Sequence, residues 1–144
     1  MKKFFSWLLI IGIFGGLAWW VNPDLLGDLS IKKNEIGRVA EAFKNRESNV
    51  MVEVEGRVIL LLPDIKDVKG ALQQFVIELE NGHRLLVSHN IDIAPAVPAG
   101  VSSIVQIKGE YDWSDTGGTI HWTHRDRAGE RAGGWIEYNG TRYQ

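Results

Sequence analysis

From Val50 to the C-terminus, short stretches of alternating apolar and polar residues are separated by turns rich in glycine and proline. Successive side chains of a β-strand point to opposite faces, so this period of two predicts half-buried strands. Asn81-Gly82 and Asn139-Gly140 are strong hairpin signals because both residues accept the left-handed backbone of a tight turn. The pattern therefore predicts an all-β domain.

We expect five strands and a C-terminal hairpin in this region. The strands are predicted at residues 50–62, 73–80, 84–88, 103–113 and 119–123, and the hairpin at 135–143. Gly56 lies near the middle of the long first strand, where a bulge or bend is expected. A long bent strand and a long connection after the third strand favour a small five-stranded barrel of the oligonucleotide/oligosaccharide-binding (OB) kind. A curled SH3-like sheet is the alternative.

Charge and cysteine content exclude several classes of function. The chain has no cysteine, which excludes disulfides, thiolate zinc sites and cysteine nucleophiles. From Val50 onward, nine lysine or arginine residues stand against 13 aspartate or glutamate residues. Binding to a nucleic-acid backbone needs an excess of positive charge, so general nucleic-acid binding is disfavoured.

An apolar run covers residues 4–21, directly after two lysines. About 18 residues at 1.5 Å each give roughly 27 Å, close to the hydrocarbon thickness of a bilayer. Trp19 and Trp20 stand where a signal peptidase needs small residues, and they suit a membrane interface. We predict a signal anchor and transmembrane helix at residues 1–21, with the rest of the chain exported. A cleaved signal that releases the domain is the alternative.

Residues 22–48 are predicted to link this segment to the barrel domain at residues 49–144. Residues 22–30 contain proline and glycine and are expected to form a turn region. A short amphipathic helix follows, because apolar residues recur at i, i+3, i+4 and i+7. Those residues are Ile36, Val39, Ala40 and Phe43.

Several histidines and carboxylates could form a metal site in the last part of the chain. The candidate ligands are His89, His121, His124 and Asp126, with Asp92 as an alternative carboxylate. Three imidazoles and one carboxylate suit zinc or another borderline divalent metal. On a strand, His121 and His124 point to opposite faces, so they share a metal only if the chain turns near Thr123. The alternative is that these histidines make structural hydrogen bonds.

A metal at this position would lower the pKa of a bound water, so the alternative function is a metal-dependent hydrolase. Asp126 or Asp92 would then act as the base, and nearby arginines would hold an anion. Without a metal, the sequence offers no serine in a nucleophile-elbow context. We therefore favour a binding protein over an enzyme.

Aromatic and arginine residues of the same region could bind a ligand by stacking and by charge. The candidates are Trp113, Trp122, Arg125, Arg127 and Trp135. Tryptophan faces accept sugars or peptides, and arginines accept anions. The alternative is that the tryptophans fill a small core.

Four motifs occur in order along the predicted domain: SHNIDIAP at residues 88–95, GEYDW at 109–113, HWTH-x-D at 121–126 and GWI at 134–136. Together they resemble a family of small exported bacterial proteins that is catalogued only as a domain of unknown function. The resemblance covers residues 43–144. It implies an OB-like barrel and an exported location, and it supplies no activity.

The chain departs from the pattern of that family at three places. Family members often carry further histidines where this chain has Leu72, Arg125 and the pair Glu130-Arg131. A histidine-rich metal site would therefore have fewer ligands here. We expect a domain anchored in the bacterial inner membrane and exposed to the periplasm, which binds a small ligand or an envelope protein.

Overall fold

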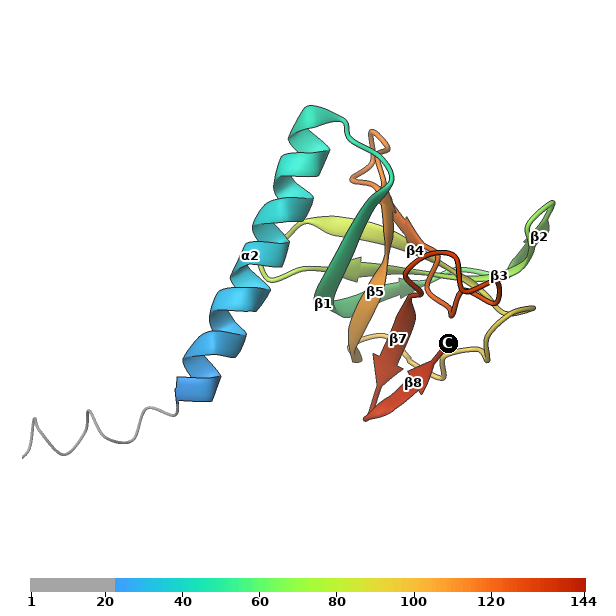
Figure 1. The fold of residues 1–144 in the computed structure, drawn as a ribbon. Coiled ribbons are helices and arrows are strands. Elements are labelled where there is room, and N and C mark those ends of the chain that lie inside the picture. The colour runs from blue at the N-terminus through green and yellow to red at the C-terminus, as the bar shows by residue number, and fades with distance from the viewer. Residues whose placement is uncertain (1–22) are drawn as a thin grey trace, which may run out of the picture. The chain divides into compact units, whose positions relative to one another are not determined.

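The computed structural model describes residues 23–144, and that part of the chain holds one helix and one eight-stranded sheet (Figure 1). The helix is α2 (Pro23–Asn45). The strands are β1 (Val50–Leu61), β2 (Ile65–Asp67), β3 (Gly70–Glu78), β4 (Arg84–Asn90), β5 (Ile104–Asp112), β6 (Thr119–His121), β7 (Trp135–Tyr138) and β8 (Thr141–Tyr143). The all-β class predicted from the alternating pattern is confirmed.

Five of the strands close into a ring. β1 pairs with β3, β3 with β4, and β5 with both β6 and β1, all antiparallel. The ring is completed by a parallel pairing of β4 with β6. The hairpin of β7 and β8 extends the sheet from β5, as predicted around Asn139-Gly140. A closed ring leaves few strand edges unpaired, so few sites remain at which another chain could add a strand.

The inside of the ring is filled by the inward residues of the alternating strands. Val54, Phe75, Ile77, Val87 and Ile107 are all at most 3% exposed. Their alternation with polar residues on the outside is the pattern from which the strands were predicted.

The C-terminal half of α2 packs on this core, since Val39 and Ala42 are buried there and Ile36 and Phe43 pack against it. The predicted amphipathic helix is therefore confirmed. The compact unit that holds the barrel begins at Asn34.

The predicted turn region at residues 22–30 is wrong, because α2 begins at Pro23 and continues to Asn45. Proline suits the first turn of a helix, where its missing N–H would have no partner, and Asp24 complements the helix dipole there. The segment predicted to span the membrane, residues 1–21, lies outside the described residues. Among residues 23–144, no helix is both long and apolar enough to cross a bilayer.

The strand geometry differs from the prediction at the bulge of β1. The register of β1 against β3 shifts between Val58 and Leu60 rather than at Gly56. Gly56 instead allows close packing, because a Cβ at this position would lie 2.9 Å from Cδ1 of Ile77. β2 was not predicted, since all three of its residues are exposed and it shows no alternation of burial.

Candidate functional site

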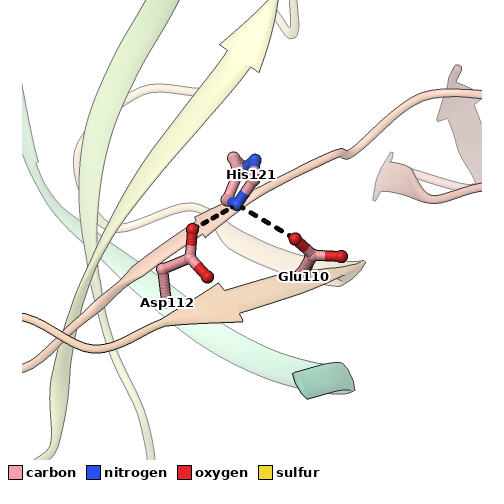
Figure 2. Close-up of side chains that lie close together, drawn as sticks. All are labelled: Glu110, Asp112 and His121. Carbon is pink, nitrogen blue, oxygen red and sulfur yellow. Dashed lines mark hydrogen bonds and ion pairs between the residues drawn. The ribbon is translucent and has the colours of Figure 1, made fainter. Parts of the chain in front are cut away.

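Glu110, Asp112 and His121 form a carboxylate–imidazole cluster on the outside of the barrel. The register of β5 and β6 places Glu110 directly opposite His121. His121 Nε2 lies 2.6 Å from Asp112 Oδ2 and 3.5 Å from Glu110 Oε1, between the two carboxylates (Figure 2). Glu110 and Asp112 share one face of β5 because they are two residues apart.

Each carboxylate of the cluster also has a partner outside it. Asp112 Oδ1 accepts a hydrogen bond from the backbone N–H of Asn49 at 3.0 Å. Glu110 Oε2 forms an ion pair with the guanidinium of Arg131. Thus one oxygen of each carboxylate is held by the protein, and the other faces the imidazole.

Arg131 belongs to the loop of residues 122–134, which Trp122 organises. Trp122 adopts a left-handed backbone with φ 55°, which is unusual for a bulky residue and turns the chain away from β6. Its indole N–H donates to the carbonyl of Ala132 at 3.0 Å. Cζ of Arg131 lies over the indole, 4.2 Å from the ring centroid. The ring of His124 also packs against the indole, with 4.6 Å between the two ring centroids.

Asp126 holds the same loop in shape through backbone hydrogen bonds. Its carboxylate accepts from the N–H groups of Ala128, Glu130 and Arg131, at 3.2, 2.7 and 2.8 Å. These bonds, first of all the one from Arg131, lower the pKa of Asp126. Asp126 therefore positions Arg131, which in turn positions Glu110.

His89 lies inside the barrel and has a partner at each ring nitrogen. Its Nε2 is 2.9 Å from the carbonyl oxygen of Pro95, and its Nδ1 is 2.7 Å from Oγ1 of Thr123. A carbonyl only accepts, so Nε2 carries the proton and donates it, while Nδ1 of the neutral ring accepts from the hydroxyl. Burial lowers the pKa of His89, which favours this neutral form.

The structure does not bring the predicted metal ligands His89, His121, His124 and Asp126 together. His124 Nδ1 lies 2.8 Å from the carbonyl oxygen of Arg125, and among residues 23–144 His124 does not share a group of potential ligands with His121. Asp92, the alternative carboxylate, accepts from the backbone N–H of Ala71 at 2.9 Å.

Among residues 23–144, one group of three potential ligands has its atoms within 4.8 Å of one another, and it consists of Glu110, Asp112 and His121. Of its members, the metal-site prediction included His121 alone. The spacing of the two carboxylates on one strand was a usable signal, but their pairing with His121 depends on the register of β5 and β6.

The predicted stacking residues are partly covered by arginines of the same chain. Trp135 is buried beneath Arg142, whose Cζ lies 4.0 Å from the ring centroid. Trp113 packs against the core, and Cζ of Arg46 lies 5.3 Å from its ring centroid. Arg125 and Arg127 are exposed, and Arg127 donates to the carbonyl of Ile93 at 3.3 Å. Ligand binding by this set stays a prediction.

A second surface feature is apolar. The register of β1, β3 and β4 places Leu60, Val76 and Leu86 in one row, on the face opposite to the buried Phe75. Ile65 pairs with Leu72 further along the same face of β3. These five residues form what we call the outer apolar face. Leu60 is 49% exposed and Ile65 43%, whereas Val76 and Leu86 are half-buried and Leu72 is buried, so Leu60 and Ile65 are the members most open to solvent.

The fold defines this chain as a small closed β-barrel domain with a helix packed on it. The chain belongs to the family described as a protein of unknown function (DUF3465), whose model matches residues 26–144. This confirms the resemblance to a domain of unknown function and assigns no activity. A comparison with curated proteins found none that matches the chain.

Proposed function

We propose that the chain is a membrane-anchored, exported OB-like barrel that binds a protein of the bacterial envelope through the outer apolar face. The observation that carries this proposal is the row of aliphatic residues across β1, β3 and β4. Leu60 and Ile65 are its exposed members, and a large contiguous apolar surface on a monomer typically marks a site of interaction.

The position of this face agrees with the place where OB barrels bind their ligands. In the strand ring, β3 is the second strand and β4 the third, and the connection between the first and second strands carries β2. OB barrels use the face of their second and third strands, together with the loop between the first and second. This support is an analogy of fold, and the chemistry of the face must identify the ligand.

The side chains favour a protein over the other ligands of such barrels. Nucleic acid requires basic residues and stacking aromatics, and sugars require aromatic platforms. The outer apolar face is aliphatic, and the Glu78–Arg84 ion pair beside it has its charges already matched at 2.9 Å. Aliphatic contacts of this kind match the apolar centre of a protein interface. We propose no hydrolytic reaction on His121, His124 and Asp126, because within residues 23–144 these three do not form one group of potential metal ligands.

The anchor and the location are part of the proposal and rest on the sequence of residues 1–21. An apolar segment behind two lysines favours a cytoplasmic N-terminus and a periplasmic barrel. Protease added to spheroplasts should digest the barrel of the full chain while intact cells protect it. Protection in spheroplasts as well would contradict the periplasmic location.

Site-directed photo-crosslinking in bacterial cells tests the partner. Leu60 of the full chain is replaced by a benzophenone amino acid, and Leu29 of α2 serves as the matched control because it is a leucine of similar exposure, 54% against 49%. We expect a discrete protein adduct from position 60 and none from position 29. Mass spectrometry of the adduct then identifies the partner.

A charge on the same face sharpens the test. Ile65→Asp is an exposed substitution that should leave the fold intact and remove the adduct at position 60, because a buried unpaired charge opposes docking. Equal adducts from positions 29 and 60, an adduct that Ile65→Asp leaves unchanged, or an adduct with lipid alone would each contradict a protein site on this face.

A further inference from the structure

We propose that Glu110, Asp112 and His121 bind a divalent transition-metal cation, for which Zn²⁺ is the best probe. This carboxylate–imidazole cluster lies on β5 and β6, whereas the outer apolar face lies on β1 to β4. The proposal therefore stands apart from the function proposed above, and each is tested without the other.

The distances within the cluster are close to those of a metal site. Ligands about 2.1 Å from a zinc ion in tetrahedral geometry lie roughly 3.4 Å from one another. His121 Nε2 is 3.5 Å from Glu110 Oε1 and 2.6 Å from Asp112 Oδ2 (Figure 2). All three ligand atoms lie within 4.8 Å of one another, and the contact between His121 and Asp112 would have to lengthen by less than about 1 Å to admit the ion. Asp112 has the freedom to move because its side chain is 38% exposed.

Contacts outside the cluster hold its ligands in a binding arrangement. The backbone N–H of Asn49 occupies Asp112 Oδ1, and Arg131 occupies Glu110 Oε2. The other oxygen of each carboxylate thus faces His121 Nε2. Second contacts of this kind are typical of metal sites, where they orient the ligand and tune its affinity.

The burial of Glu110 gives an independent reason for a cation. Its side chain is 10% exposed, although it lies on the outer face of the barrel. His121 Nε2 lies 2.6 Å from Asp112 Oδ2, whereas it lies 3.5 Å from Glu110 Oε1, longer than a good hydrogen bond. Arg131 balances one of the two carboxylate charges. A cation at the centre would contact Glu110, Asp112 and His121 together.

The ligand types select the metal. One imidazole nitrogen and two carboxylate oxygens suit zinc and similar borderline ions, whereas calcium and magnesium prefer oxygen ligands alone. Three protein ligands leave at least one coordination position open. His121 is 26% exposed, so zinc can reach the cluster from solvent. Bound there, the ion would cross-link β5 and β6.

The test uses the full chain in detergent micelles, made without a histidine tag and freed of metal by a chelator that is then removed. Calorimetric titration with Zn²⁺ should show about one ion bound per chain. His121→Gln and Asp112→Asn should each weaken the zinc affinity by about 100-fold, the upper range for losing even a supporting contact of a metal site. Circular dichroism checks that each variant is folded.

Two further variants separate this site from other histidines. His83→Gln is the matched control, because His83 Nε2 bonds the carbonyl of Gly117 at 2.7 Å outside the cluster, and it should leave the affinity unchanged. His124→Gln should also leave it unchanged. In the native protein, zinc should shift the imidazole NMR signals of His121 and spare those of His83. No zinc bound at millimolar concentration, no effect of His121→Gln, or an equal loss in His124→Gln would overturn the proposal.

Discussion

His89 and His121 are both hydrogen-bonded histidines of this barrel, yet their surroundings differ. His89 is fully buried, and its two nitrogens are bonded to Pro95 and Thr123. His121 is partly exposed at the end of β6, and its Nε2 faces Asp112 and Glu110. Both regions depend on the loop of residues 122–134, which provides Thr123 to one and Arg131 to the other.

The contrast shows that partners and solvent access separate a structural histidine from a candidate ligand. A buried neutral imidazole with both nitrogens bonded has no capacity left for a metal. An imidazole that faces two carboxylates near solvent can exchange its proton for a cation. The predictions below test whether the two regions behave as differently as these surroundings require.

The largest effect is expected from removing the buried histidine. His89→Ala leaves a cavity and takes away the partners of the Pro95 carbonyl and the Thr123 hydroxyl. We expect a loss of about 3 kcal/mol in the free energy of unfolding, measured with urea. A loss below about 1 kcal/mol is typical of a surface substitution, and it would contradict a structural role for the buried His89.

Gly134→Ala should be next, because it disturbs the loop that serves both regions. A Cβ at this position would overlap the backbone carbonyl oxygens of Trp122 and Lys108. We expect a loss of about 2 kcal/mol in unfolding free energy. In Gly37→Ala, the control, the added Cβ on α2 has nothing within 4 Å and should stabilise the fold by roughly 0.5–1 kcal/mol. Equal effects of the two substitutions would refute the packing argument.

The pH dependence of stability tests the neutral state of His89. Burial lowers its pKa in the folded protein, so the unfolded chain binds a proton more readily. Its stabilising contribution is therefore complete above the unfolded pKa of about 6.5 and is lost as the pH falls from there through the folded pKa. Urea unfolding between pH 8 and pH 5 should show this decline in the native chain and a smaller one in His89→Gln. Parallel curves would mean that another group is responsible.

The smallest effect on stability is expected at the surface cluster. His121→Ala removes a partly exposed ion pair, so the metal-free protein should lose less than about 1 kcal/mol in unfolding free energy. Thermal melting with and without Zn²⁺ then separates the roles. Zinc should raise the melting temperature of the native chain and leave that of His121→Ala unchanged. If His121→Ala lost as much unfolding free energy as His89→Ala, then His121 would be a structural residue like His89, contrary to this comparison.

Local patterns predicted most of the barrel and part of the site. The strands from Val50 onward and the turn at Asn139-Gly140 follow from alternation and from residues that accept a left-handed backbone. The start of α2 at Pro23 was missed because proline and glycine were interpreted as turn formers, although a proline is favourable in a first helical turn. His121 was singled out, but its predicted partners were His89, His124 and Asp126 or Asp92, and not the two carboxylates of β5.

The amino-acid sequence by itself determined the all-β class, the apolar lining of the barrel and the concentration of reactive side chains in the C-terminal third. These features depend on residues that are close together in the sequence, so the periodicity and spacing of residue types predict them. Tertiary structure alone decided that Glu110 lies opposite His121, that Asp126 supports Arg131, and that His89 is buried. The contacts between strands depend on strand register, because a shift of one residue turns every side chain of a strand to the other face. The register is fixed only when the strands pair into the closed ring.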